Sequence, residues 1–133
     1  MRVVQLSDSL SVSDQIAVDD VATIAEAGFK VLINNRPDQE VANQPSSDEI
    51  AAAAEVAGLR YYYMPVTARD FPGLDLAELS ALINDAASPA LAFCRSGTRC
   101  TNLWVATRGI EQRDASVTVA RQLGYDLSMA LVN

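Results

Sequence analysis

Short apolar runs typical of buried strands alternate along this chain with segments typical of helices. The strand signals lie at residues 10–12, 29–33, 59–66 and 90–93, and the first of them is a candidate edge strand. Strands separated by helices pair in parallel, because the crossover brings the chain back in the same direction. The alternation therefore predicts an α/β fold with a largely parallel central sheet and helices on both faces. A length of 133 residues predicts a single domain, residues 1–133.

Capping residues and glycines predict where the helices begin and end. Ser46 and Glu49 have the spacing of a capping box, and Gly58 ends the helix that follows them. The other helices are predicted to run from Asp19 or Asp20 to Gly28, from Asp75 through Ile83, from the loop at residues 94–99 through Trp104 toward Ile110, and from Asp114 to Gly124.

The loop Cys94-Arg95-Ser96-Gly97-Thr98-Arg99 follows the strand at residues 90–93 directly and leads into a helix. A cysteine near a helix N-terminus faces backbone N–H groups, which lower the pKa of its thiol and make it a nucleophile. Gly97 lets the backbone curl so that several N–H groups point inward and cradle an anion. Arg95 adds positive charge, and Arg99 supplies a fork for two oxygens of a tetrahedral anion. The loop therefore predicts a small intracellular enzyme that acts through the Cys94 thiolate.

A buried structural cysteine at a strand end is the alternative interpretation of Cys94. Two arginines, a glycine and a serine within the same six residues favour the functional one. Arg36 and residues 67–73 follow neighbouring strands, so the fold places them on the same side of the sheet, where ligands of parallel sheets bind.

Composition excludes several other classes of protein. The chain contains no histidine, which removes hydrolases that need a histidine base and most zinc sites. A net charge of −7 with no basic stripe argues against nucleic-acid binding. The apolar runs are too short to span a bilayer and no signal pattern is visible, so we expect a soluble cytoplasmic protein with two free thiols and no metal or cofactor.

The chain resembles the cysteine-phosphatase and rhodanese group at this loop, and more closely the phosphatase-like family of beta-lactamase hydrolase-like proteins. The resemblance extends from about Leu10 through the last helix. It depends on the pieces Gly28-Phe29, Asn34-Asn35-Arg36-Pro37-Asp38-x-Glu40, Gln44-Pro45-Ser46, Gly58-Leu59, Pro65-Val66, Phe93-Cys94-Arg95-Ser96-Gly97-Thr98-Arg99 and Leu103-Trp104, with Gln15 before them.

This resemblance implies a fold like that of dual-specificity protein tyrosine phosphatases. It also implies that Cys94 attacks phosphorus to form a phosphocysteine, that Arg99 binds the phosphoryl oxygens, and that water hydrolyses the intermediate. The expected partner is a small anionic substrate, either a phosphate ester or a donor of sulfane sulfur. Arg95, Ser96, Gly97 and Thr98 would line the anion site.

Three features differ from the pattern of the tyrosine phosphatases. Four residues separate Cys94 from Arg99 where those enzymes have five, and the shorter loop is typical of rhodaneses, which carry a persulfide. Phe93 stands where histidine is usual. Cys100 stands where a serine or threonine normally donates to the departing thiolate, and a thiol is a weaker donor. A sulfurtransferase with a Cys94 persulfide is therefore the alternative function, and a binding module that only holds an anion is the third.

The acid that protonates a leaving oxygen has several candidates. Asp70 is the first, on the loop after the third predicted strand, and a solvated loop carboxylate is its alternative interpretation. Asp38 and Glu40 follow a strand end and are the others. Arg36 could pair with either of these carboxylates or contact substrate. The resemblance favours a site role for Arg36 and Asp38, although Arg36-Pro37-Asp38 is also good turn chemistry.

Cys100 lies six residues after Cys94 and admits two interpretations. It could resolve an oxidised Cys94 by forming a disulfide. We favour a small buried residue in the first turn of the helix.

Overall fold

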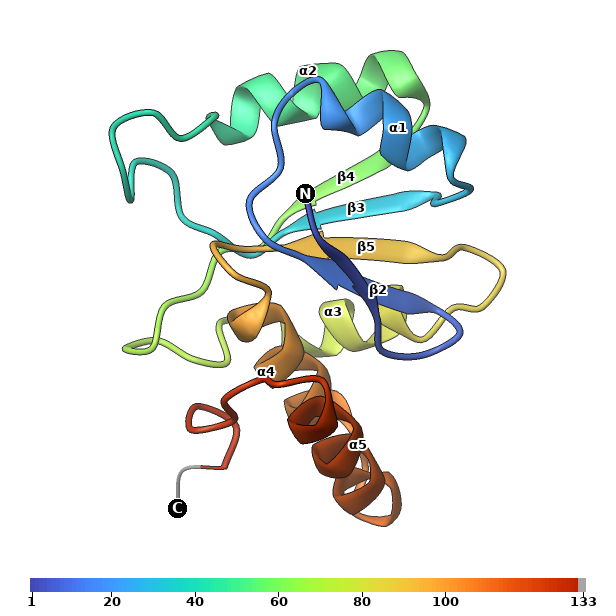
Figure 1. Cartoon of the computed structure of the whole chain (residues 1–133), viewed down its shortest axis with the longest axis vertical. Helices are drawn as coiled ribbons and strands as arrows, with labels where there is room; N and C mark the ends of the chain where they lie inside the picture. Colours follow the sequence, from blue (N-terminus) through green and yellow to red (C-terminus); the bar gives the residue numbers. More distant parts are fainter. Residues whose placement is uncertain (132–133) are drawn as a thin grey trace.

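The structure, a computed structural model, describes residues 1–131 and is built on one sheet of five strands (Figure 1). The strands are β1 (Val3–Gln5), β2 (Leu10–Ser13), β3 (Val31–Asn34), β4 (Arg60–Tyr63) and β5 (Ala90–Phe93). Their order across the sheet is β1-β2-β5-β3-β4. All neighbours are parallel except β1 and β2, which are antiparallel. The predicted largely parallel sheet is confirmed.

The edge next to β2 differs from the prediction. The sequence pattern made the strand at residues 10–12 a candidate edge strand, but β1 covers it, with Val3 opposite Ser13 and Gln5 opposite Ser11. β1 is three residues long, and its outer two are exposed. Three residues are too few to show an alternating pattern, so the two valines of β1 do not mark it as a strand.

Helices cover both faces of the sheet, as predicted. On one face lie α1 (Asp20–Glu26) and α2 (Ser47–Ala57), and on the other lie α3 (Leu76–Ile83) and α4 (Thr98–Thr107), with α5 (Ile110–Gln122) packed against α4 (Figure 1). The capping box before α2 is confirmed, because the Ser46 hydroxyl accepts from Glu49 N and the Glu49 carboxylate accepts from Ser46 N.

The central strands contribute alternate residues to two separate hydrophobic cores, one on each face of the sheet. On β3 and β5, Leu32, Leu91 and Phe93 pack with α1 and α2, whereas Ile33 and Ala92 pack with α3 and α4. All five are fully or almost fully buried. Strands buried on both faces read as continuous apolar runs, which is why the sequence located them.

The predicted start of the last helix needs correction. The last helix begins at Ile110 after Gly109, so Asp114 lies inside α5 rather than at its start. The backbone of Arg108 is extended between α4 and α5, so Ile110 belongs to α5 and not to α4. Ile110 is 92 % exposed and lies outside the core. Asp75 does precede α3, but its side chain makes no capping hydrogen bond.

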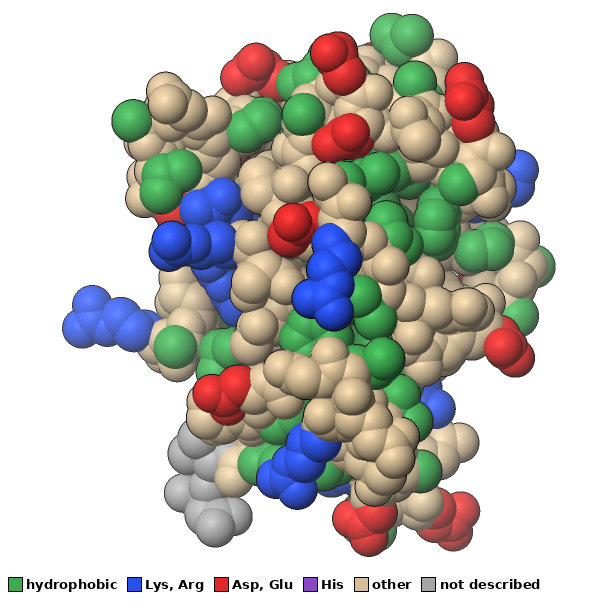
Figure 2. All heavy atoms as spheres, in the orientation of Figure 1, with side chains coloured by type: hydrophobic (Ala, Val, Ile, Leu, Met, Phe, Trp, Pro, Cys, Tyr) green, Lys and Arg blue, Asp and Glu red, His purple; other side chains and the backbone are tan. Residues whose placement is uncertain are grey.

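The carboxyl ends of β3, β4 and β5 lie side by side at one edge of the sheet and lead into the loops that carry the predicted site residues (Figure 1). Arg36, Arg69, Arg95 and Arg99 all come from these segments. Figure 2 shows basic side chains gathered on this side of a molecule whose net charge is −7. The field at this edge therefore favours an anion.

No helix within residues 1–131 is long and apolar enough to cross a membrane. The predicted domain, residues 1–133, includes residues 132 and 133, which lie outside the described residues. Its boundaries stay a prediction.

Candidate active site

The Cys94 loop closes around the sulfur atom at the end of β5. Cys94 is 1 % exposed, and its own N–H donates to the Ser13 carbonyl of the neighbouring β2 at 3.3 Å. The N–H of Gly97 donates to Cys94 Sγ at 3.1 Å. α4 begins immediately afterwards at Thr98, so its N-terminus faces the thiol. This is the arrangement of cysteine, amides and helix end that the sequence predicted.

These surroundings lower the pKa of Cys94 from 9.0 to about 6. The neighbouring thiol of Cys100 is the largest cause, since its S–H stabilises the thiolate. Burial opposes it, and the backbone N–H groups of Cys100, Ser96 and Arg99 add to the lowering. At neutral pH Cys94 is therefore mainly a thiolate, without any histidine.

Cys100 is fully enclosed in the first turn of α4, and burial raises the pKa of its thiol well above 9.0. It remains a protonated donor while Cys94 is ionised. Both cysteines are free. Cys100 thus occupies the small buried position that we favoured, and in addition it stabilises the Cys94 thiolate.

Gly97 lies at the point where the loop turns into α4. Its φ is 88°, in the left-handed region that side chains rarely adopt. A Cβ at this position would lie 3.3 Å from the Tyr125 hydroxyl and 3.6 Å from the Ser13 carbonyl. The backbone conformation therefore favours glycine here, and a side chain would also require a small shift of Tyr125.

Glu40, on the segment between β3 and α2, forms a salt bridge with the guanidinium of Arg99. Arg99 Nη1 donates to Glu40 Oε2 at 2.9 Å, and Nη2 donates to Oε1 at 2.7 Å. Nη1 also donates to the Val66 carbonyl at 3.1 Å, on the segment that follows β4. This pairing lowers the pKa of Glu40 and raises that of Arg99, so both groups stay charged.

The pairing leaves one edge of Arg99 available. A guanidinium has five N–H donors, and Glu40 and Val66 occupy both donors of Nη1 and one of Nη2. Within residues 1–131 these bonds leave Nε and the second donor of Nη2 without a partner, and the two lie side by side on the planar group. This edge has the geometry to bind two oxygens of a tetrahedral anion.

Arg36 extends the same network into the protein. It is 3 % exposed, and its Nε donates to Glu40 Oε1 at 2.8 Å while Nη1 donates to Gln15 Oε1 at 3.0 Å. The N–H of Gln15 in turn donates to the Arg95 carbonyl at 3.3 Å. Arg36 thus fixes the position of Glu40, and Glu40 in turn fixes the position of Arg99.

The other predicted site residues lie as follows. Arg95 and Ser96 are exposed on the loop, and the Ser96 hydroxyl donates to Thr98 Oγ1 at 2.9 Å. Asp38 lies at the start of α2, where its Oδ1 accepts from Ser47 N at 2.8 Å. The structure therefore brings Arg36 to the site through Glu40 and engages Asp38 in a turn contact with α2.

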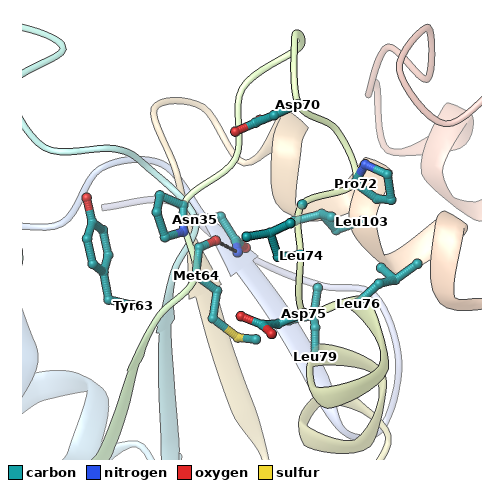
Figure 3. Close-up of a pocket in the computed structure, with 12 residues that line it drawn as sticks. Asn35, Tyr63, Met64, Asp70, Pro72, Leu74, Asp75, Leu76, Leu79 and Leu103 are labelled. Carbon is teal, nitrogen blue, oxygen red and sulfur yellow. Dashed lines mark hydrogen bonds between the residues drawn. The ribbon is translucent and has the colours of Figure 1, made fainter.

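Asp70 lies on the exposed segment after β4 (Figure 3). Its Oδ1 accepts from Thr67 N at 2.6 Å and from the Thr67 hydroxyl at 3.0 Å. The Thr67 backbone bond, followed by the hydroxyl bond, lowers the pKa of Asp70. The carboxyl is therefore ionised at neutral pH, and its role as an acid stays a prediction.

Sequence reasoning considered Glu40 as a candidate acid and as a partner for Arg36, which the structure confirms, but it missed the pairing of Glu40 with Arg99. The signal was present in the spacing of Arg36 and Glu40, but nothing local indicated a partner 59 positions away. Within residues 1–131, no group of three or more cysteine or acidic side chains is arranged to hold a metal ion.

A largely parallel sheet flanked by helices, with a cysteine loop at the end of a central strand and an arginine in the first turn of the helix that follows, defines an α/β domain of the tyrosine-phosphatase fold class. The chain belongs to the family described as beta-lactamase hydrolase-like protein, phosphatase-like domain, whose model matches residues 1–111.

Known relatives and solved structures agree with this assignment. A beta-lactamase hydrolase-like protein of Xylella fastidiosa is 33 % identical over 134 residues, which cover 98 % of this chain and 31 % of that protein. This chain thus spans about a third of the length of the curated relatives it matches. A crystal structure of a candidate phosphatase from Neisseria meningitidis is 38 % identical, with a TM-score of 0.81, and the match covers 96 % of this chain and 92 % of that one.

A more distant match is TpbA of P. aeruginosa, solved in complex with pTyr. It is 19 % identical with a TM-score of 0.63, over 96 % of this chain and 76 % of that one. At this identity the match shows the fold alone, and it confirms the predicted fold class.

Proposed function

We propose that this chain is a phosphatase that hydrolyses phosphate monoesters through a phosphocysteine on Cys94. The observation that carries the proposal is the Cys94 thiolate, with a pKa of about 6, which accepts from the Gly97 N–H at the start of α4, the helix that also carries Arg99. Membership of a phosphatase-like family supports the same reaction.

The first step transfers the phosphoryl group to sulfur. Cys94 Sγ attacks phosphorus, the S–P bond forms, and the P–O bond to the leaving group breaks with its electron pair on oxygen. The loop N–H groups and the free Arg99 edge bind the phosphoryl oxygens where negative charge is concentrated. Water then attacks phosphorus, the S–P bond breaks, phosphate leaves, and Cys94 returns to the thiolate that Cys100 stabilises.

The leaving group sets the expected substrate class. Asp70 is the proposed acid, but its lowered pKa leaves little of the protonated form at neutral pH. Esters whose leaving oxygen is a weak base need least protonation. We therefore expect aryl phosphates, including phosphotyrosine, to react much faster than alkyl phosphates.

The sulfurtransferase remains the alternative to be tested, because four residues separate Cys94 from Arg99. The family and the Neisseria relative favour the phosphatase. The activity of any longer protein that contains this domain, and the cytoplasmic location, stay predictions.

The test supplies the purified chain with p-nitrophenyl phosphate and, separately, with thiosulfate and cyanide. We expect phosphate release that Cys94→Ser abolishes, no thiocyanate, and unchanged rates in the control Asp114→Asn on α5. Thiocyanate without phosphate would overturn the proposal in favour of sulfur transfer. Neither product, with phosphate still bound to the chain, would identify a binding module.

A further inference from the structure

A cavity lies next to the segment that carries Asp70. It has a volume of about 330 Å³ and lies between residues 64–76, the start of α3 and α4 (Figure 3). No residue of the Cys94 loop lines it, but Asp70, the proposed acid, does, so the cavity adjoins the proposed anion site without including its loop. Its volume falls in the range of small-molecule pockets, which begins at about 300 Å³.

The walls of the cavity are mainly apolar. The side chains of Met64, Leu76, Leu79 and Leu103 line it, and Figure 3 shows them surrounding a common centre. Such a lining favours the apolar body of a ligand over water. Met64 is unbranched and flexible, so this wall can adapt to an occupant.

One buried acceptor on the lining has no partner. Asn35 is 1 % exposed, and its Nδ2 donates to the Met64 carbonyl at 2.8 Å, which fixes the orientation of the amide. Its Oδ1 then has no hydrogen-bond partner among the described residues. Figure 3 shows this amide pointing toward the centre of the lining side chains. An unpaired buried acceptor costs free energy that a ligand donor recovers once the covering side chains shift.

The charged groups at the cavity are also acceptors. Asp70 and Asp75 line it, and no lysine or arginine does. Asp75 makes no capping hydrogen bond, and the ion pairs of residues 1–131 leave it free, because they involve only Glu40. The cavity therefore combines apolar walls with acceptors and negative charge, the opposite of the anion site at Cys94.

We propose that this cavity binds a small organic ammonium ion with an apolar body. The ammonium group pairs with the Asp75 carboxylate and donates to Asn35 Oδ1, and the apolar body packs against the leucines of α3 and α4. The negative charge of the site disfavours an anionic ligand. Binding there requires no chemistry at Cys94.

The experiment titrates the ¹⁵N-labelled chain with phenethylammonium chloride and follows the ¹H–¹⁵N spectrum. We expect saturable shifts at the Asn35 side-chain amide and at the backbone of Leu79 and Leu103, with Gly97 unaffected. 2-Phenylethanol should bind more weakly, and 3-phenylpropanoate should not bind. The absence of saturable shifts, or shifts confined to residues 94–99, would overturn the proposal.

A matched pair of variants isolates the charge. Asp75→Asn should weaken phenethylammonium binding about fivefold and leave the alcohol unaffected, as expected for a partly exposed ion pair. Glu78→Gln removes the same charge from the exposed face of α3 and should change neither. Equal affinities in the two variants would contradict the role of Asp75. Because binding is measured without turnover, its failure is distinct from failure of the phosphatase proposal.

Discussion

The Cys100 thiol gives the sharpest test of how this chain makes a thiolate without histidine. Lowering the pKa of Cys94 from 9.0 to about 6 corresponds to about 4 kcal/mol of preference for the thiolate, at about 1.36 kcal/mol per pKa unit. Four hydrogen-bond contributions lower the pKa of Cys94 and together outweigh the opposing effect of burial, and the Cys100 thiol makes the largest of them. It therefore supplies at least about a quarter of that preference, roughly 1 kcal/mol, and Cys100→Ala should raise the pKa of Cys94 by about 1 or more.

The assay is the ultraviolet absorbance of the thiolate as a function of pH. In the natural chain the step near neutral pH belongs to Cys94, because Cys100 titrates far higher. In Cys100→Ala, Cys94 is the only thiol, so its step is measured alone. Cys100→Ser should keep the step at or below its natural position, since a hydroxyl is a stronger donor than a thiol. A step in Cys100→Ala at the natural position would refute the reasoning.

Three further predictions follow from the same site. Glu40→Gln should lower kcat/KM for an aryl phosphate about tenfold, because Arg99 loses its carboxylate partner, and unchanged kinetics would contradict this. Urea unfolding should show a stability loss of about 1–3 kcal/mol, because the Arg36 side chain, which is only 4 % exposed, loses its charged partner as well. Gly97→Ala should cost about 1–3 kcal/mol in urea unfolding, because it forces a side chain to φ 88° against Tyr125. The folded pKa of Cys94 lies below its unfolded value, so its stabilisation is complete above 9.0 and is lost as the pH falls through about 6. From pH 8 to pH 5 the natural chain should lose about 2 to 3 kcal/mol relative to Cys94→Ser, and parallel profiles would contradict the shift.

Much of the fold followed from local patterns. The buried strands were visible because both of their faces are covered, and the start and end of α2 were visible because Ser46, Glu49 and Gly58 act within a few residues of one another. β1 was not predicted because a strand of three residues is too short to show an alternating pattern. The start of α5 was misplaced because Asp114 has the chemistry of a cap, although the chain had already turned at Gly109.

The sequence by itself determined the reactive element of this protein. Cys94, Gly97 and the start of α4 lie within a few residues, so the amides that enclose the sulfur come from the same short segment that carries it. Bonds across so few positions depend on backbone conformation, and glycine and helix signals encode that conformation locally.

Only the tertiary structure decided which carboxylate serves the site. Asp38 and Glu40 are two residues apart, yet Asp38 bonds the start of α2 and Glu40 bonds Arg99. Parallel strands bring the ends of β3, β4 and β5 to one edge, and the contact from Glu40 to Arg99 and on to Val66 exists only once they are aligned. Such pairs form between segments far apart in the chain, and their geometry is set by strand register rather than by any neighbouring residue.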